Sequence, residues 1–190
     1  MKKIFIIALV MGALSLQAQV MNTDSTTNEP LNSVNNIIKG NSSKGITLGA
    51  YAQIDYNQEL DGDTYRNGKM DVHRLVLFLG YKFGERTTFV TEIELEHVSE
   101  VYVEQAFLNY QIDPRLNFRA GLVLIPMGII NEYHEPTLFN GVERPNLDGK
   151  IVPTTWRELG AGFSGNFANA SLKYQLYVVN GFNGYSDGAG

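Results

Sequence analysis

The chain has 190 residues, no cysteine, a formal net charge of −5, ten tyrosines, ten phenylalanines and nineteen glycines. Without cysteine it cannot be a disulfide-stapled scaffold, and an acidic balance with no basic block argues against nucleic acid as a partner. Many aromatic residues and glycines together favour strands joined by turns.

The first residues have the pattern of a secretory signal peptide. Lys2 and Lys3 precede an uncharged, mostly apolar run from Ile4 to Leu16, and small residues up to Ala18 offer a cleavage site. The run is too short to span a bilayer comfortably. We therefore expect residues 1–18 to be a signal peptide. Residues 19–44 are rich in Asn, Ser and Thr without periodicity, which predicts a flexible leader.

From residue 46 onward, apolar and polar residues alternate, as they do in half-buried strands. The seven candidate strands span 46–56, 70–83, 87–98, 101–112, 116–125, 156–167 and 171–179. Strands of roughly ten residues are long enough to cross a membrane at a tilt. The connections after the first and fifth are long, and those after the second, fourth and sixth are short, as in an outer-membrane barrel. The connection after the third is also short.

Aromatic residues collect at one end of the predicted strands. If the first strand runs outward, the periplasmic ends carry on their apolar face Tyr81, Phe83, Phe89, Tyr110, Phe118, Phe167 and Tyr174. Tyr56 and Tyr102 are expected on that face at the outer end. Aromatic girdles at both interfaces are typical of barrels in a bilayer, whereas a sandwich core does not require aromatics at strand ends. We predict an all-β fold, an antiparallel transmembrane β-barrel, with a soluble sandwich as the alternative.

The strand count suggests a larger assembly. Bacterial single-chain barrels have even strand numbers, and lipid does not tolerate the two open edges of a seven-stranded sheet. We expect residues 45–190 to be the N-terminal part of a longer barrel. A multi-chain barrel and pairing by the leader are the alternatives.

The segment PMGIINEYHEPTLFNGVERPNLDGKIVPTTWRELGAGFSG (126–165) resembles porins of the phosphate-selective O/P type, especially those of Bacteroidetes. VEQAFLNY (103–110), LNFRAGLVLIPMG (116–128), VERP (142–145) and WRELG (156–160) carry the resemblance. It implies a barrel of roughly sixteen strands, usually homotrimeric, that passes small solutes or ions through the outer membrane of a Gram-negative bacterium. An anion or phosphate bias is implied as well.

In such a barrel the polar strand face would line the lumen. Segment 126–155, which contains four prolines, is expected to fold inward and narrow the pore; packing on the rim or at a subunit contact is the alternative. The candidate pore-lining or constriction residues are Arg74, Glu92, Glu94, Glu96, Glu104, Arg119, His134, Glu135, Glu143, Arg144, Arg157, Glu158 and Lys173. No basic ladder dominates this set, so the anion bias stays open.

We expect no cofactor, no metal and no enzymatic activity. His73, His97 and His134 lack metal-ligand spacing, and Ser164 does not stand in a GxSxG motif. Residues 160–165 match GxGxxG, but they lie within an alternating strand that another strand follows, where a dinucleotide-binding turn needs a helix.

Gly160 and Gly162 are instead expected to leave room for the inward loop. Three functions compete: a diffusion porin, a non-conducting outer-membrane barrel for adhesion or ligand binding, and a secreted β-sandwich binding module. Membrane lipid and small solutes or ions are the partners that the first of these implies.

Overall fold

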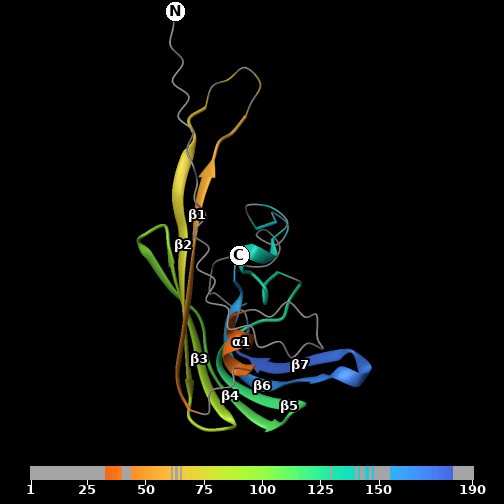
Figure 1. Cartoon of the computed structure of the whole chain (residues 1–190). Coiled ribbons are helices and arrows are strands. Elements are labelled where there is room, and N and C mark those ends of the chain that lie inside the picture. The colour runs from red at the N-terminus through yellow and green to blue at the C-terminus, as the bar shows by residue number, and fades with distance from the viewer. Residues whose placement is uncertain are drawn as a thin grey trace, which may run out of the picture. The chain divides into compact units, whose positions relative to one another are not determined.

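The chain folds into one seven-stranded antiparallel sheet in the order β1-β2-β3-β4-β5-β6-β7 (Figure 1). The strands are β1 Gly45–Asn57, β2 Lys69–Lys82, β3 Thr87–Glu96, β4 Glu100–Asp113, β5 Leu116–Leu124, β6 Arg157–Phe167 and β7 Leu172–Val179. Three short helices accompany them: α1 Ser33–Lys39 and the 3-10 turns η1 Pro136–Leu138 and η2 Ala168–Ala170. The predicted all-β antiparallel fold is confirmed.

The computed structural model describes residues 33–39, 44–60, 62, 64, 66–128, 130–139, 141, 144–145, 147 and 155–181. The predicted signal peptide and most of the predicted leader lie outside these residues. No helix in the described part of the chain is long and apolar enough to cross a membrane.

One face of the sheet is exposed and largely apolar, and the other is covered and mixes charged side chains with apolar ones. On β2, Leu75, Leu77 and Leu79 are 37–42% exposed, whereas Arg74 and Val76 on the opposite face are 6% and 0% exposed. β3 alternates in the same sense, and β1 exposes an aliphatic row that includes Ile46, Leu48 and Ile54. An antiparallel sheet with one face in water normally buries its apolar side. Here the more uniformly apolar face is the exposed one, and the covered face holds both the charged side chains and the hydrophobic cluster.

Register places the aromatic residues in a band near the short connections. Tyr81 pairs with Phe89, and Tyr110 pairs with Phe118. The rings of Phe118 and Phe163 are 5.5 Å apart, and those of Phe167 and Tyr174 are also 5.5 Å apart. With Phe83, all seven expected aromatic residues therefore lie at one end of the exposed face, as the alternation predicted.

Helix α1 lies on the inner, polar face of the sheet, where it contacts β2 and β3 (Figure 1). Val34 and Ile37 are buried in a cluster that includes Phe78, Val90 and Phe107. A seven-residue helix is unstable alone in water, so this packing holds it together. The prediction of a flexible leader is wrong for residues 33–39, because their order depends on contacts distant in sequence.

A β-bulge in β4 corrects one expected orientation. Glu92 pairs with Gln105 and Ile93 with Val103, so Glu104 is an extra residue in the strand. One extra residue shifts the alternation of the side chains that precede it relative to those that follow. Tyr102 consequently lies opposite Glu94 on the inner face, not in the outer girdle as predicted.

The glycines of β6 accommodate β7 and not the inward loop. A Cβ on Gly160 would lie 2.4 Å from the Val178 carbonyl oxygen, and one on Gly162 would lie 2.0 Å from the Leu176 carbonyl oxygen. The expectation that these glycines make room for the loop is therefore wrong. Because β6 leads through η2 into β7, the strand-to-helix setting of a dinucleotide-binding turn is absent from these described residues.

Candidate functional site

The candidate site is the inner face of the sheet beneath segment 130–139. Asn131, which is 4% exposed, anchors this segment. Its Nδ2 donates to the carbonyl oxygens of Ile125 at 2.7 Å and Trp156 at 2.9 Å, and its Oδ1 accepts from the Trp156 backbone N–H at 2.8 Å. Ile125 follows β5 and Trp156 precedes β6, so one side chain ties the two strand ends together.

Two carboxylates extend from this segment to other elements. Glu132 accepts hydrogen bonds from Gln175 Nε2 on β7 at 2.9 and 3.0 Å, and it lies 3.5 Å from Lys173 Nζ. Glu135 Oε1 accepts from the Ser33 backbone N–H at 2.7 Å. That contact satisfies a donor in the first turn of α1 and puts negative charge at the favourable end of the helix. The described part of the loop thus lies over the inner face of the sheet, and its narrowing of a pore stays a prediction.

Ionisable side chains pack closely at this face, and we call seven of them the inner cluster. Its members are Arg74, Glu92, Glu94, Glu96, Glu104, His134 and Arg157. Six of these seven come from four different strands, and His134 comes from segment 130–139. All seven were expected to line the lumen, and the structure brings them together.

Ion pairs hold much of the inner cluster. Arg74 lies between two carboxylates, with Nη1 3.0 Å from Glu94 and Nη2 3.7 Å from Glu96. Arg157 Nη1 donates to Glu104 Oε1 at 2.9 Å. Glu94 and Glu104 are 1% and 3% exposed, so their partners are needed to offset the cost of desolvating charge.

Glu92 has a neutral partner instead of a guanidinium. Gln105 Nε2 donates to Glu92 Oε2 at 2.5 Å, and His134 Nε2 lies 3.9 Å from Glu92 Oε1. The bulge at Glu104 makes this arrangement possible, because it buries Glu104 and Gln105 side by side.

His134 is a neutral imidazole in this setting. Burial, and after it the guanidiniums of Arg144, Arg74 and Arg157, together lower the pKa of His134 to about 3. Its Nδ1 lies 3.1 Å from the Asn131 carbonyl oxygen, which can only accept. Nδ1 therefore carries the proton, and Nε2 presents a lone pair toward the carboxylates.

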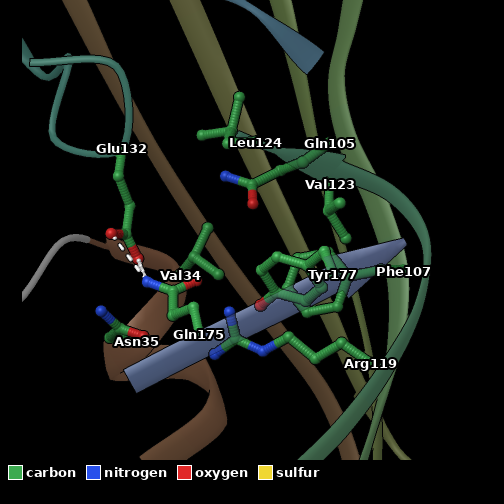
Figure 2. Close-up of a pocket in the computed structure, with 10 residues that line it drawn as sticks. All are labelled: Val34, Asn35, Gln105, Phe107, Arg119, Val123, Leu124, Glu132, Gln175 and Tyr177. Atoms are coloured by element: carbon green, nitrogen blue, oxygen red, sulfur yellow. Dashed lines mark hydrogen bonds between the residues drawn. The ribbon is translucent and has the colours of Figure 1, made fainter. Parts of the chain in front are cut away.

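A small pocket lies between α1, β4, β5, β7 and the loop (Figure 2). Arg119 is its one cationic lining residue in the described chain, and its guanidinium lies 5.2 Å from the Phe107 ring. Arg119 Nε donates to Asn109 Oδ1 at 3.0 Å. Figure 2 shows Glu132 and Gln175 joined by hydrogen bonds on the opposite side.

The remaining predicted site residues make other contacts. Lys173 lies 5.0 Å from the Tyr133 ring, and Glu158 accepts from Trp156 Nε1 at 3.0 Å. Arg144 donates to Thr155 Oγ1 at 3.5 Å. Glu143 lies outside the described residues.

Sequence reasoning missed Asn131, Glu132 and Gln105. Their roles depend on partners at least six positions away, and no local pattern marks them. Alternation could have placed Gln105 on the inner face only if the bulge beside it had been known.

No family model matches this chain, and no solved structure matches it. A curated relative from Aquifex aeolicus (strain VF5), described as an uncharacterized protein, is 40% identical over 146 residues. The match covers 73% of this chain and 33% of the relative, so the chain spans about a third of that relative's length.

The inner face offers fixed charges and hydrogen-bonding groups. Carboxylates and guanidiniums in water-filled barrels select and slow ions by electrostatics. The arrangement therefore suits the binding or passage of small charged or polar species.

Proposed function

We propose that this chain forms part of an outer-membrane β-barrel porin through which small solutes or ions diffuse. The exposed, largely apolar face of the sheet is the observation that carries this proposal. Leu77 and its neighbours on the exposed face are apolar, whereas the chain's own α1 and segment 130–139 cover the polar face. Barrels in lipid place apolar side chains outward and polar ones inward. In a soluble sandwich, by contrast, a second sheet would cover the apolar face that includes Leu77.

Barrel closure in this proposal needs further strands. Among the described residues, β1 pairs with β2 alone and β7 pairs with β6 alone. Because lipid does not tolerate unpaired strand edges, strands from a longer protein or from other copies would close the sheet. The resemblance to phosphate-selective O/P porins supports a barrel of roughly sixteen strands and a homotrimer in the outer membrane.

In this proposal, the charged side chains of the inner face determine which ions the pore prefers. The inner cluster pairs Arg74 and Arg157 with carboxylates, so these guanidiniums form no continuous basic ladder. We therefore expect little preference for phosphate over chloride at this part of the pore. The reversal potential in a gradient of each salt measures that preference.

The packing on the inner face favours a second candidate, a barrel that binds a ligand and conducts little. Helix α1 buries Val34 and Ile37 against the sheet, and Glu135 of the loop is bonded to its first turn. These elements reduce the open cross-section next to β2, β3 and β4.

Planar-bilayer recording of the purified full-length protein separates the candidates. A porin gives stepwise conductance, and deletion of residues 33–39 is expected to raise the size of each step. Heat-dependent gel mobility without conductance, in both the wild type and the deletion variant, would favour the ligand-binding barrel. Recovery in a soluble fraction without heat-dependent mobility would rule out both.

A further inference from the structure

Three buried side chains with metal-binding atoms converge from three elements. Glu94 comes from β3, Glu104 from β4 and His134 from segment 130–139. One ligand atom from each lies within 4.8 Å of those of the others, and the three residues are only 1–3% exposed. No two of these residues are neighbours in sequence, so only the fold creates the group.

Two carboxylate oxygens in this group are buried without a hydrogen bond. Glu104 uses Oε1 to accept from Arg157, but its Oε2 is buried and accepts none. Glu94 Oε1 lies 3.0 Å from Arg74 Nη1, yet no donor is aligned for a hydrogen bond to it. Buried polar atoms are nearly always satisfied in folded proteins, by protein groups, ordered water or an ion.

A backbone carbonyl fixes the orientation of the His134 imidazole, as is common for metal-binding histidines. Its Nδ1–H donates to the Asn131 carbonyl, and Asn131 is itself tied to both strand ends by three hydrogen bonds. A backbone carbonyl on one ring nitrogen orients the other nitrogen toward a metal and makes it more basic. The nitrogen that remains, Nε2, faces Glu92 Oε1 at 3.9 Å.

Carboxyl groups and guanidiniums gather around this point. Glu92, Glu94, Glu96 and Glu104 are four carboxylates, and the guanidiniums near them belong to Arg74, Arg144 and Arg157. A cation bound among them would give the buried Glu94 Oε1 and Glu104 Oε2 a partner.

We propose that Glu94, Glu104 and His134 bind a divalent transition-metal ion, Zn²⁺ in the first instance, which clamps segment 130–139 onto β3 and β4. Zn²⁺ accepts imidazole nitrogen together with carboxylate oxygen, whereas Ca²⁺ and Mg²⁺ prefer oxygen alone. Zinc–ligand distances of about 2.0–2.2 Å place tetrahedral ligand atoms about 3.4 Å apart. The three ligand atoms here lie within 4.8 Å of one another, so metal binding would need small side-chain rotations that bring them closer. Glu92 lies next to this group, with Oε1 3.9 Å from His134 Nε2.

Metal binding by the full-length protein, folded in detergent micelles, tests this proposal. The protein is treated with EDTA, dialysed and titrated with Zn²⁺, and bound metal is counted after gel filtration. We expect one retained equivalent per chain, competed by Mn²⁺ more strongly than by Ca²⁺ or Mg²⁺. His134→Gln and Glu104→Gln are expected to lose this equivalent.

The matched control is His97→Gln. His97 is also a histidine beside a carboxylate, with Nδ1 2.6 Å from Asp71, but it lies in the β3–β4 turn outside the proposed site. This variant should keep the full equivalent. Heat-dependent gel mobility checks that each variant is folded.

Absence of a retained equivalent in the folded wild type, or its persistence in folded His134→Gln, would overturn the proposal. Should both site variants fail to fold, the Co²⁺-loaded wild type decides. Intense visible absorption that Zn²⁺ displaces is expected, and a featureless spectrum overturns the site. Neither readout involves conductance, so failure of the metal site can be distinguished from failure of the proposed porin function.

Discussion

Ile37 of α1 fills the space that Gly80 leaves on the inner face of β2. A Cβ built on Gly80 would lie 2.2 Å from Ile37 Cγ2, far closer than any real contact. Ile37 is 9% exposed, so its side chain has little freedom to retreat. A glycine at this position of β2 therefore allows the helix to lie against the sheet.

We expect Gly80→Ala to dislodge α1 and to lower the free energy of unfolding by about 1–3 kcal/mol, the usual cost of overpacking. Denaturant titration in detergent measures this. Gly49→Ala is the control, because a Cβ there would lie 3.7 Å from Phe78 Cβ, an ordinary contact. Equal losses in the two variants would contradict a specific role for Gly80.

Asn131→Ala removes three hydrogen bonds at the root of segment 130–139 and leaves the Trp156 backbone N–H without its acceptor. A loss of about 2–3 kcal/mol in the free energy of unfolding is expected, since leaving a buried donor unsatisfied costs about 1–3 kcal/mol. Asn131→Asp should restore less than wild-type stability, because its carboxylate can accept from the Trp156 N–H but cannot donate to the carbonyls of Ile125 and Trp156. Chemical denaturation measures the free energy of unfolding of both variants. Wild-type stability in Asn131→Asp would argue against the role of Asn131 in tying the ends of β5 and β6 together.

Arg74→Gln leaves the buried Glu94 carboxylate without its cation. Breaking one side of a buried ion pair typically costs about 3–5 kcal/mol, and we expect a loss in that range. The double variant Arg74→Gln with Glu94→Gln should recover much of it, because no unpaired charge remains there. A double-mutant cycle by denaturation provides the measurement. Simple additivity of the two single losses would show that the pair is not coupled.

Leu77→Arg tests whether the exposed face meets lipid. Leu77 is 42% exposed at mid-strand in β2, opposite Ala50 and Ile93. In a bilayer a charge there costs about 2–4 kcal/mol, whereas a surface substitution in water changes stability by about 0.5 kcal/mol at most.

Folding titrations in lipid vesicles measure the effect of Leu77→Arg, and Leu60→Arg is the control. Leu60 follows β1 in the connection to β2 and is 93% exposed. A loss in Leu77→Arg no larger than that in Leu60→Arg would remove the main support for a membrane barrel.

Local patterns were sufficient for the strands and for most of their faces. Alternation over 87–98 predicted β3, and it placed Glu92 and Glu94 on the inner face, where the structure has them. The same reasoning failed for Tyr102, because the bulge at Glu104 has no composition signal. It also missed α1, whose two buried apolar residues are too few to mark a helix.

The sequence by itself determined which residues form strands, which face of most strands is apolar, and where the aromatic band lies. These features depend on a two-residue period and on turn composition, which are local. Only the tertiary structure decided that Ile37 packs over Gly80 and that His134 meets Glu94 and Glu104. Those contacts join segments far apart in the chain, and they depend on register, a bulge and loop packing, which spacing in a single sequence does not encode.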